Sequence, residues 1–307
     1  MTEKRYEQCI LATCCIPWAG DLRFEEAIFR RHVKRILEEG TDHVYIFGTA
    51  GEGHAVSDEL FEEITRVFVD EMVSGGGVPM VGVINTSLAT ILKRIELAGS
   101  LGVRDFQISV PAWGACSFRE AHRFFEVVCT RFPELRFLHY NTVRGGRVLT
   151  ADEYAEIAEA FPNFSGTKNT QDSLGTVAAL VHTTPQLRHF FTEQPFAAAC
   201  LLGLDAGFLI SIAGTNWARA REFYRAGVTG DRDRVASDTF ELERVRNLVL
   251  ALRSDRRMSD GAYDKMYQRL LDEEFPLRLL PPYEFFTDEE FQTLKRRIQS
   301  TSPGWVE

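Results

Sequence analysis

The sequence predicts an α/β fold, a (β/α)8 TIM barrel with a C-terminal helical appendage. Short apolar runs alternate with longer segments of helical period from residue 9 to residue 226, which is the pattern of a parallel sheet with helical crossovers. About eight such units fit a closed barrel, which usually takes about 250 residues. An open nucleotide-binding sheet would need a G-x-G-x-x-G turn after its first strand, whereas this chain has Ile16-Pro17-Trp18-Ala19-Gly20 there.

The expected elements follow from the period of the apolar residues. The strands are Cys9–Cys15, His43–Phe47, Val78–Ile84, Asp105–Val110, Arg136–Tyr140, Phe164–Lys168, Arg188–Thr192 and Phe208–Ile212. The helices are Phe24–Glu39, Ser57–Val73, Leu88–Leu101, Phe118–Phe132, Thr150–Phe161, Leu174–Thr183, Phe196–Leu202 and Trp217–Ala226. Gly40, Gly102 and Pro133 end three of these helices, since neither residue type continues a helix easily. Thr150 begins another, with Glu153 at the spacing of a capping box.

The apolar runs typical of strands stop after Gly227. Three further segments have helical period, namely Val235–Leu252, Gly261–Leu271 and Thr287–Ile298. We therefore expect residues 1–227 to form the catalytic (β/α)8 barrel and residues 228–307 to form a C-terminal helical region.

Composition narrows the classes of function. The 307 residues carry a net charge of −9, with 45% hydrophobic and 26% charged residues, which is the balance of a globular protein. A nucleic-acid partner would require a basic face, and an anionic membrane surface would repel this acidic chain. We therefore expect a small-molecule substrate rather than a nucleic acid or a membrane.

The cysteines and the first residues bear on cofactors and location. The six cysteines are scattered without a CxxC pair, so we expect free thiols in a reducing cytoplasm rather than a zinc or redox site. Met1–Glu7 are charged and lack the apolar stretch of a signal peptide. The expected strand ends hold no cluster of histidines and acids at ligand spacing. We expect neither a metal nor another cofactor.

Lys168 is the most informative residue at the strand ends, where a barrel of this type has its active site. Inside a ring of apolar strands its ammonium is partly desolvated, which lowers the pKa and frees the amine as a nucleophile. Such an amine forms a Schiff base with a carbonyl, and the imine then accepts electrons from an adjacent bond. The alternative is a lysine that extends to solvent from a strand end.

Tyr140 ends the strand before that of Lys168. Side chains alternate along a strand, so Leu138 and Tyr140 share one face while His139 faces the outer helices. A phenol above Lys168 can move protons to and from the substrate oxygen; alternatively, Tyr140 only lines the barrel. The loop Gly48–Gly53, which contains Thr49, has exposed amides that suit an anion such as a carboxylate.

These residues together resemble the dihydrodipicolinate synthase / N-acetylneuraminate lyase family of class I aldolases. The matching segments are Gly48-Thr49-Ala50-Gly51-Glu52, Tyr140-Asn141, Gly166-Thr167-Lys168 and Gly207-Phe208-Leu209-Ile210-Ser211-Ile212. Tyr140 precedes Lys168 by 28 residues, as the equivalent pair does in many members. The resemblance covers nearly the whole chain, and it also implies a homotetramer built from tight dimers, or a homodimer.

The resemblance implies a role for each matching residue. Lys168 forms the Schiff base with pyruvate or a related 2-oxo acid. Tyr140 is the proton shuttle, and Thr49 orients its phenol. The amides of Thr49 and Ala50, with Gly51 beside them, hold the substrate carboxylate. Ile210, in the eighth expected strand, lies near the pyruvyl group.

Three positions depart from the synthases of this family. Ala50 replaces a Thr or Ser, which removes a side-chain hydrogen bond worth about 1.5–3 kcal/mol when the partner is charged. Trp113 stands where the synthases have a second tyrosine, and an indole exchanges no proton usefully. Gly145 stands where they have an arginine that binds the second substrate, and Arg144 lies one residue early. We therefore expect a second substrate, an aldehyde or hydroxy acid, that differs from that of the synthases.

Several alternatives stay open within this resemblance. Pro111-Ala112-Trp113 is similar to the aromatic hydratase-aldolases, in which a tryptophan forms an apolar wall. Glu193 could bind hydroxyls, as in the sugar-acid lyases, and a 2-oxo acid dehydratase would use the same imine. If the chain is a true dihydrodipicolinate synthase, Arg144 must bind the second substrate in place of the arginine that Gly145 replaces. The missing groups at Ala50 and Trp113 also fit a non-catalytic keto-acid-binding member. The joint retention of Lys168, Tyr140 and Thr49 argues against that alternative.

Overall fold

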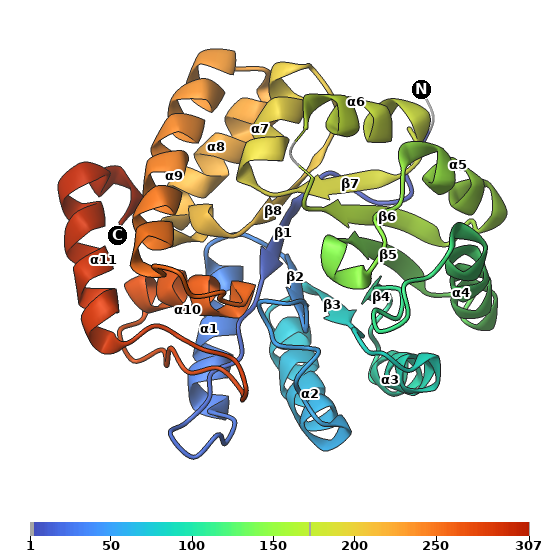
Figure 1. Cartoon of the computed structure of the whole chain (residues 1–307), viewed down its shortest axis with the longest axis horizontal. Coiled ribbons are helices and arrows are strands. Elements are labelled where there is room, and N and C mark those ends of the chain that lie inside the picture. Colours follow the sequence, from blue (N-terminus) through green and yellow to red (C-terminus); the bar gives the residue numbers. More distant parts are fainter. Residues whose placement is uncertain (1–2, 172, 307) are drawn as a thin grey trace.

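Eight parallel strands close a barrel in chain order, with helices around its outside (Figure 1). The computed structural model describes residues 3–171 and 173–306. The strands are β1 (Ile10–Thr13), β2 (His43–Ile46), β3 (Val78–Gly82), β4 (Asp105–Ile108), β5 (Arg136–Asn141), β6 (Phe164–Asn169), β7 (Arg188–Phe191) and β8 (Gly207–Ile210). Pairing of β1 with β8 closes the ring, which confirms the fold predicted from the alternating pattern.

The crossover helices also match their predicted positions. They are α1 (Glu26–Glu38), α2 (Asp58–Ser74), α3 (Leu88–Ser100), α4 (Phe118–Arg131), α5 (Ala151–Ala160), α6 (Leu174–Thr183), α7 (Glu193–Leu201) and α8 (Trp217–Thr229). Helix α7 begins three residues before the expected Phe196, because Pro195 is tolerated in a first turn, where its missing N–H leaves no bond unmade. Among the described residues, no helix combines the length and apolar character needed to cross a membrane.

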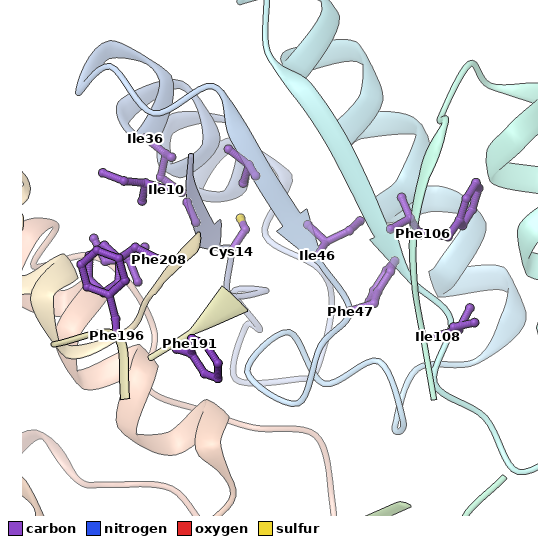
Figure 2. Packing of buried hydrophobic residues seen from close by; sticks show 14 of the residues in the cluster. Ile10, Cys14, Ile36, Ile46, Phe47, Phe106, Ile108, Phe191, Phe196 and Phe208 are labelled. Carbon is purple, nitrogen blue, oxygen red and sulfur yellow. The ribbon is translucent and has the colours of Figure 1, made fainter. Parts of the chain in front are cut away.

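Strand alternation divides the apolar core into two layers. Leu11, Tyr45, Met80, Leu138, Phe190 and Leu209, from six different strands, pack together inside the barrel with Tyr6. The alternate positions face the helices and join a larger cluster. Figure 2 shows part of this outer layer, with Ile10, Ile46 and Phe208 on strands and Ile36 and Phe196 on helices. The inner layer fills the lumen of the barrel. Space for a site is therefore left at the ends of the strands rather than inside the barrel.

The C-terminal helices are α9 (Arg232–Leu252), α10 (Asp260–Leu271) and α11 (Asp288–Thr301). Helix α9 packs on α7, α8 and α11. Helix α10 contacts η2 (Ile212–Thr215), a short 3₁₀ helix that follows β8. The predicted helical region therefore lies against the carboxyl ends of the strands, where it adds residues to the site.

Glu52 connects this region to the loop after β2. Its carboxylate is fully buried and accepts hydrogen bonds from Lys265 Nζ (2.7 Å), Trp18 Nε1 (2.8 Å) and the Leu280 backbone N–H (2.6 Å). A buried carboxylate is stable only with such partners. The contacts join the β2 loop, α10 and the segment after α10 in one buried network.

Candidate active site

A cavity of about 360 Å³ lies at the carboxyl ends of the strands. Its walls include Tyr45, Tyr140, Lys168, Glu193, Asp260 and Asp264. A second cavity of about 500 Å³ adjoins it, with Thr49 and His54 in its wall. Tyr140 and Arg144 line both spaces, so they form the partition between them.

Lys168 lies on β6 with its amine enclosed by two phenols. The residue is 6% exposed, Nζ donates a hydrogen bond to Tyr45 Oη at 2.6 Å, and Nζ lies 4.0 Å from the ring centre of Tyr140. Burial lowers the pKa of Lys168 to about 8, although the charges of Asp260 and Asp264 oppose this shift. An ordinary lysine has a pKa near 10.4, so the neutral, nucleophilic form of Lys168 is roughly 200-fold more abundant at neutral pH than that of an ordinary lysine.

Tyr140 is brought to this amine by strand pairing. Tyr140 on β5 and Lys168 on β6 are direct partners in the parallel register. Thr49 Oγ1 hydrogen-bonds the Tyr140 hydroxyl at 3.4 Å, and burial raises the pKa of the phenol, which keeps it protonated. His139 faces the helices, where its Nδ1 lies 2.7 Å from Tyr154 Oη. The orientations predicted from alternation are therefore confirmed.

Tyr45 is a site residue that the sequence analysis missed. Its hydroxyl accepts hydrogen bonds from Lys168 Nζ and, at 3.1 Å, from Thr13 Oγ1. Thr13 and Tyr45 are register partners on β1 and β2. The alternation that identified Tyr140 also places Tyr45 inside the barrel, but its distance from Lys168 in the sequence gave no reason to pair them.

The glycine-rich loop after β2 turns back sharply. Phe47 and Glu52 have left-handed backbone angles, with φ of 59° and 54°. A Cβ at Gly53 would lie 2.1 Å from the carbonyl oxygen of Phe47, and one at Gly51 would lie 2.7 Å from the Phe47 nitrogen. Both positions therefore require glycine for the close approach of backbone. The turn places Ala50 in the wall of the Lys168 cavity.

Arg144 is present at the site but already paired. Its guanidinium donates two hydrogen bonds to Asp260 on α10, at 3.0 and 2.7 Å. Two parallel bonds of this kind hold both planes in a fixed orientation. The positive charge of Arg144 is therefore paired with the carboxylate of Asp260 in the same chain.

Glu193 lines the cavity and also supports its floor. One carboxylate oxygen, Oε1, accepts hydrogen bonds from the backbone N–H groups of Ser211 (2.8 Å) and Ala213 (3.0 Å). Burial raises the pKa of Glu193, and these backbone donors oppose the rise. Through these two hydrogen bonds Glu193 stabilises the turn after β8.

Known proteins place this arrangement in a family. The model of the dihydrodipicolinate synthetase family matches residues 7–272. This chain belongs to that family. Like its relatives in the dihydrodipicolinate synthetase family, this chain is an enzyme of the lyase type.

Its relatives in the dihydrodipicolinate synthetase family differ in activity. A 4-hydroxy-tetrahydrodipicolinate synthase from Nostoc sp. is 23% identical, over 66% of this chain and 69% of the relative. A 2-dehydro-3-deoxy-D-gluconate/2-dehydro-3-deoxy-phosphogluconate aldolase from Thermoproteus tenax is 26% identical, over 75% and 70%. A probable 5-dehydro-4-deoxyglucarate dehydratase from Rhizobium rhizogenes is 26% identical, over 92% and 91%.

The fold is shared with solved members of the dihydrodipicolinate synthetase family. YagE, a prophage protein from E. coli K12 solved in complex with pyruvate, superposes with a TM-score of 0.84 at 20% identity. The match covers 95% of this chain and 98% of YagE. At this identity the likeness establishes the barrel and its C-terminal helices.

Two of the expected substrate contacts lie outside the lining of the Lys168 cavity in this family member. Trp113 lies in the loop after β4, is 95% exposed, and is not among the residues that line the two cavities. Ile210 packs in the layer between strands and helices, because alternation on β8 turns it outward. Its neighbours Leu209 and Ser211 line the Lys168 cavity instead.

Helix α10 supplies acids that the sequence analysis did not assign to the site. Asp260 and Asp264 are four residues apart, so they lie on one face of the helix, and both line the Lys168 cavity. Asp264 accepts a hydrogen bond from Ser211 Oγ at 2.7 Å. The spacing of the two acids is visible in the sequence, but the docking of α10 over the barrel is not.

Proposed function

We propose that this chain is a class I lyase that acts on pyruvate or a related 2-oxo acid through an imine on Lys168. One observation carries the proposal, namely the buried amine of Lys168 between the phenols of Tyr45 and Tyr140. Desolvation supplies the neutral amine that attacks the keto carbon. The phenols supply donors for the oxygen that leaves as water.

The remaining roles follow the order of the reaction. Tyr140 passes a proton to the carbinolamine oxygen, and Thr49 holds its hydroxyl in place. The amides of Thr49 and Ala50, with Gly51 beside them, hold the carboxylate of the 2-oxo acid. Tyr45 keeps the amine directed into the cavity before attack, since its hydroxyl accepts a hydrogen bond from Nζ.

The lining of the cavity favours a hydroxylated second part of the substrate. Glu193, Gln194, Asp260 and Asp264 share the wall with Lys168, and carboxylates and amides suit hydroxyl donors. Trp113 is not among the residues that line this cavity, which argues against an aromatic aldehyde bound between its ring and Lys168. We therefore place the chain nearer to sugar-acid lyases than to aromatic hydratase-aldolases.

Dehydration of a sugar acid is the second candidate. The probable dehydratase from Rhizobium rhizogenes aligns with 92% of this chain, a longer match than that of the aldolase from Thermoproteus tenax at 75%. Both reactions begin with the same imine. They differ in the bonds broken next: cleavage breaks the C3–C4 bond of the protonated imine, whereas dehydration removes a C3 proton and then the hydroxyl at C4.

Product analysis separates the two reactions. The purified chain is incubated with 2-dehydro-3-deoxy-D-gluconate and with 5-dehydro-4-deoxyglucarate, and products are identified by mass. A lyase releases pyruvate and an aldehyde, whereas a dehydratase gives a product that has lost water. Absence of turnover with these and with other hydroxylated 2-oxo acids would contradict the proposed substrate class.

The family resemblance also supports a homo-oligomer, a tetramer of two tight dimers or a single dimer. Light scattering on the purified chain measures the assembled mass directly. A monomer at micromolar concentration would contradict this part of the proposal.

A further inference from the structure

Helix α10 brings the carboxylate of Asp264 into the Lys168 cavity, and no ion pair to it is found among residues 3–171 and 173–306. Asp260 on the same helix is paired with Arg144. For Asp264, which is 6% exposed, the one hydrogen bond found in the described part of the chain comes from Ser211 Oγ. A buried carboxyl with a single neutral donor is poorly satisfied as an anion, and such a group in a reactive cavity is a candidate for proton transfer.

The position of Asp264 differs from that of Tyr140. Tyr140 stands on β5, while Ser211, which holds Asp264, follows β8. In the closed eight-stranded ring these strands are three places apart, with β6 and β7 between them. A substrate attached to Lys168 on β6 therefore has the phenol of Tyr140 on one side and the carboxyl of Asp264 on another.

The groups around Asp264 set its charge. Asp260 on its own helix and Glu193 on α7 disfavour its ionised form, whereas Lys168 on β6 and the Ser211 hydroxyl favour it. Arg246 on α9, with Tyr263 and Tyr267 on α10, lines the same cavity. Burial is the largest influence and raises the pKa of Asp264 to about 7. The group is therefore present as both acid and base near neutral pH, as proton transfer requires.

We propose that Asp264 is a second catalytic residue, which exchanges a proton with C3 of the substrate imine. This inference rests on the proposed Lys168 imine. The Asp264 carboxylate takes a proton from C3, the C–H electron pair becomes the C2=C3 double bond, and the C2=N electrons return to nitrogen. The product is a neutral enamine and a protonated Asp264. Return of the proton to C3 restores the iminium ion and the carboxylate.

Tyr140 and Asp264 then transfer protons at different stages of the reaction. Tyr140 passes a proton to the substrate oxygen during imine formation, and Asp264 exchanges a proton with C3 after the imine has formed. Until that transfer occurs, the positive charge of the iminium ion stays where the ammonium of Lys168 stood. This charge favours the carboxylate form of Asp264 at the stage when a base is needed.

Exchange of pyruvate hydrogens in deuterated water tests this role with pyruvate as the probe. NMR follows the loss of methyl protons, and borohydride trapping in parallel samples gives the fraction of chain present as imine. We expect Asp264→Asn to retain the trapped imine and to lower exchange per imine by about 100-fold or more. Asp233→Asn, at an exposed carboxylate on α9, serves as the matched control and should exchange at the parental rate.

A second variant keeps the carboxyl and shifts its pKa. Ser211→Ala removes the donor that stabilises the Asp264 anion, so the rise of exchange per imine with pH should move to higher pH. Dividing by the trapped fraction removes the titration of Lys168 from this profile. A role of Ser211 in folding alone would lower the amount of native protein without moving the profile.

The outcomes are distinct. Exchange per imine within about threefold of the parent in Asp264→Asn, or an unmoved profile in Ser211→Ala, would overturn the role of Asp264 and leave the imine standing. Loss of exchange per imine in Tyr140→Phe alone would assign the C3 proton to the phenol. No trapped imine in the parent chain would contradict the proposed function itself, and the role of Asp264 with it.

Discussion

Lys168 and Asp264 are two ionisable residues whose pKa values burial moves toward each other. Burial lowers the pKa of the amine to about 8 and raises that of the carboxyl to about 7. Their mutual attraction acts in the opposite sense for both groups, so desolvation is the larger effect. Near neutral pH the cavity therefore contains a usable nucleophile and a usable base.

Tyr140→Phe tests the phenol at this scale. We expect turnover to fall by roughly 10²–10⁴, which is the usual contribution of positioned acid–base catalysis. Binding of the 2-oxo acid should weaken less, because the amine and the loop amides remain. Steady-state kinetics separates the two effects, and a change in turnover of only a few-fold would assign Tyr140 a structural role.

Asp264→Asn should also stabilise the folded protein in a pH-dependent way. The pKa of Asp264 is raised in the folded state, so the folded chain holds this proton more tightly than the unfolded chain. The destabilisation due to Asp264 therefore grows as pH rises from about 4 to about 7 and is constant above that. The Tm of Asp264→Asn relative to the parent should increase between pH 5 and pH 8. An equal Tm difference at both pH values would contradict the raised pKa.

At the scale of elements, the Glu52–Lys265 pair joins two parts of the site. Glu52 belongs to the loop that presents Thr49 and Ala50, and Lys265 belongs to α10, which presents Asp264. Their side chains are fully buried and lie 2.7 Å apart. The pair therefore fixes the loop relative to the helix, in addition to any contribution to stability.

Lys265→Met should be costly because it leaves the Glu52 carboxylate buried without a cation. Removing one partner of a buried pair costs about 3–5 kcal/mol, and urea unfolding measures this loss. Replacing both partners, as Glu52→Gln with Lys265→Met, should restore part of the stability, since no charge is then left buried. A double variant less stable than Lys265→Met would contradict this explanation.

Local patterns predicted the elements well, because each element follows from short-range rules. Apolar runs located all eight strands, and alternation oriented His139 and Tyr140 correctly. The placement of α10 depends instead on long-range packing and on the buried bond from Lys265 to Glu52, which no local pattern shows. Asp264 was missed for this reason. Trp113 and Ile210 were expected as substrate contacts from the resemblance alone; in this structure Trp113 is exposed and Ile210 packs in the outer apolar layer.

For the whole molecule, the question is which member of the family this chain represents. Condensation of pyruvate with aspartate semialdehyde needs a cation for the second carboxylate, and Arg144 is already bound to Asp260. Loss of that contact removes orientation as well as affinity. We expect poor turnover or none in a coupled reductase assay, even where the imine forms. Efficient turnover at submillimolar semialdehyde would show that Arg144 leaves Asp260 to bind substrate.

The most direct test of the whole account is borohydride reduction of the chain in the presence of pyruvate, followed by peptide mass mapping. The cavity around Lys168 predicts a reduced pyruvyl adduct on the peptide that contains this residue, and none in Lys168→Ala. Trapping should become faster as pH rises toward about 8, because the pKa of Lys168 has that value. An adduct on another lysine only, or no adduct with pyruvate or any other 2-oxo acid, would contradict the mechanism.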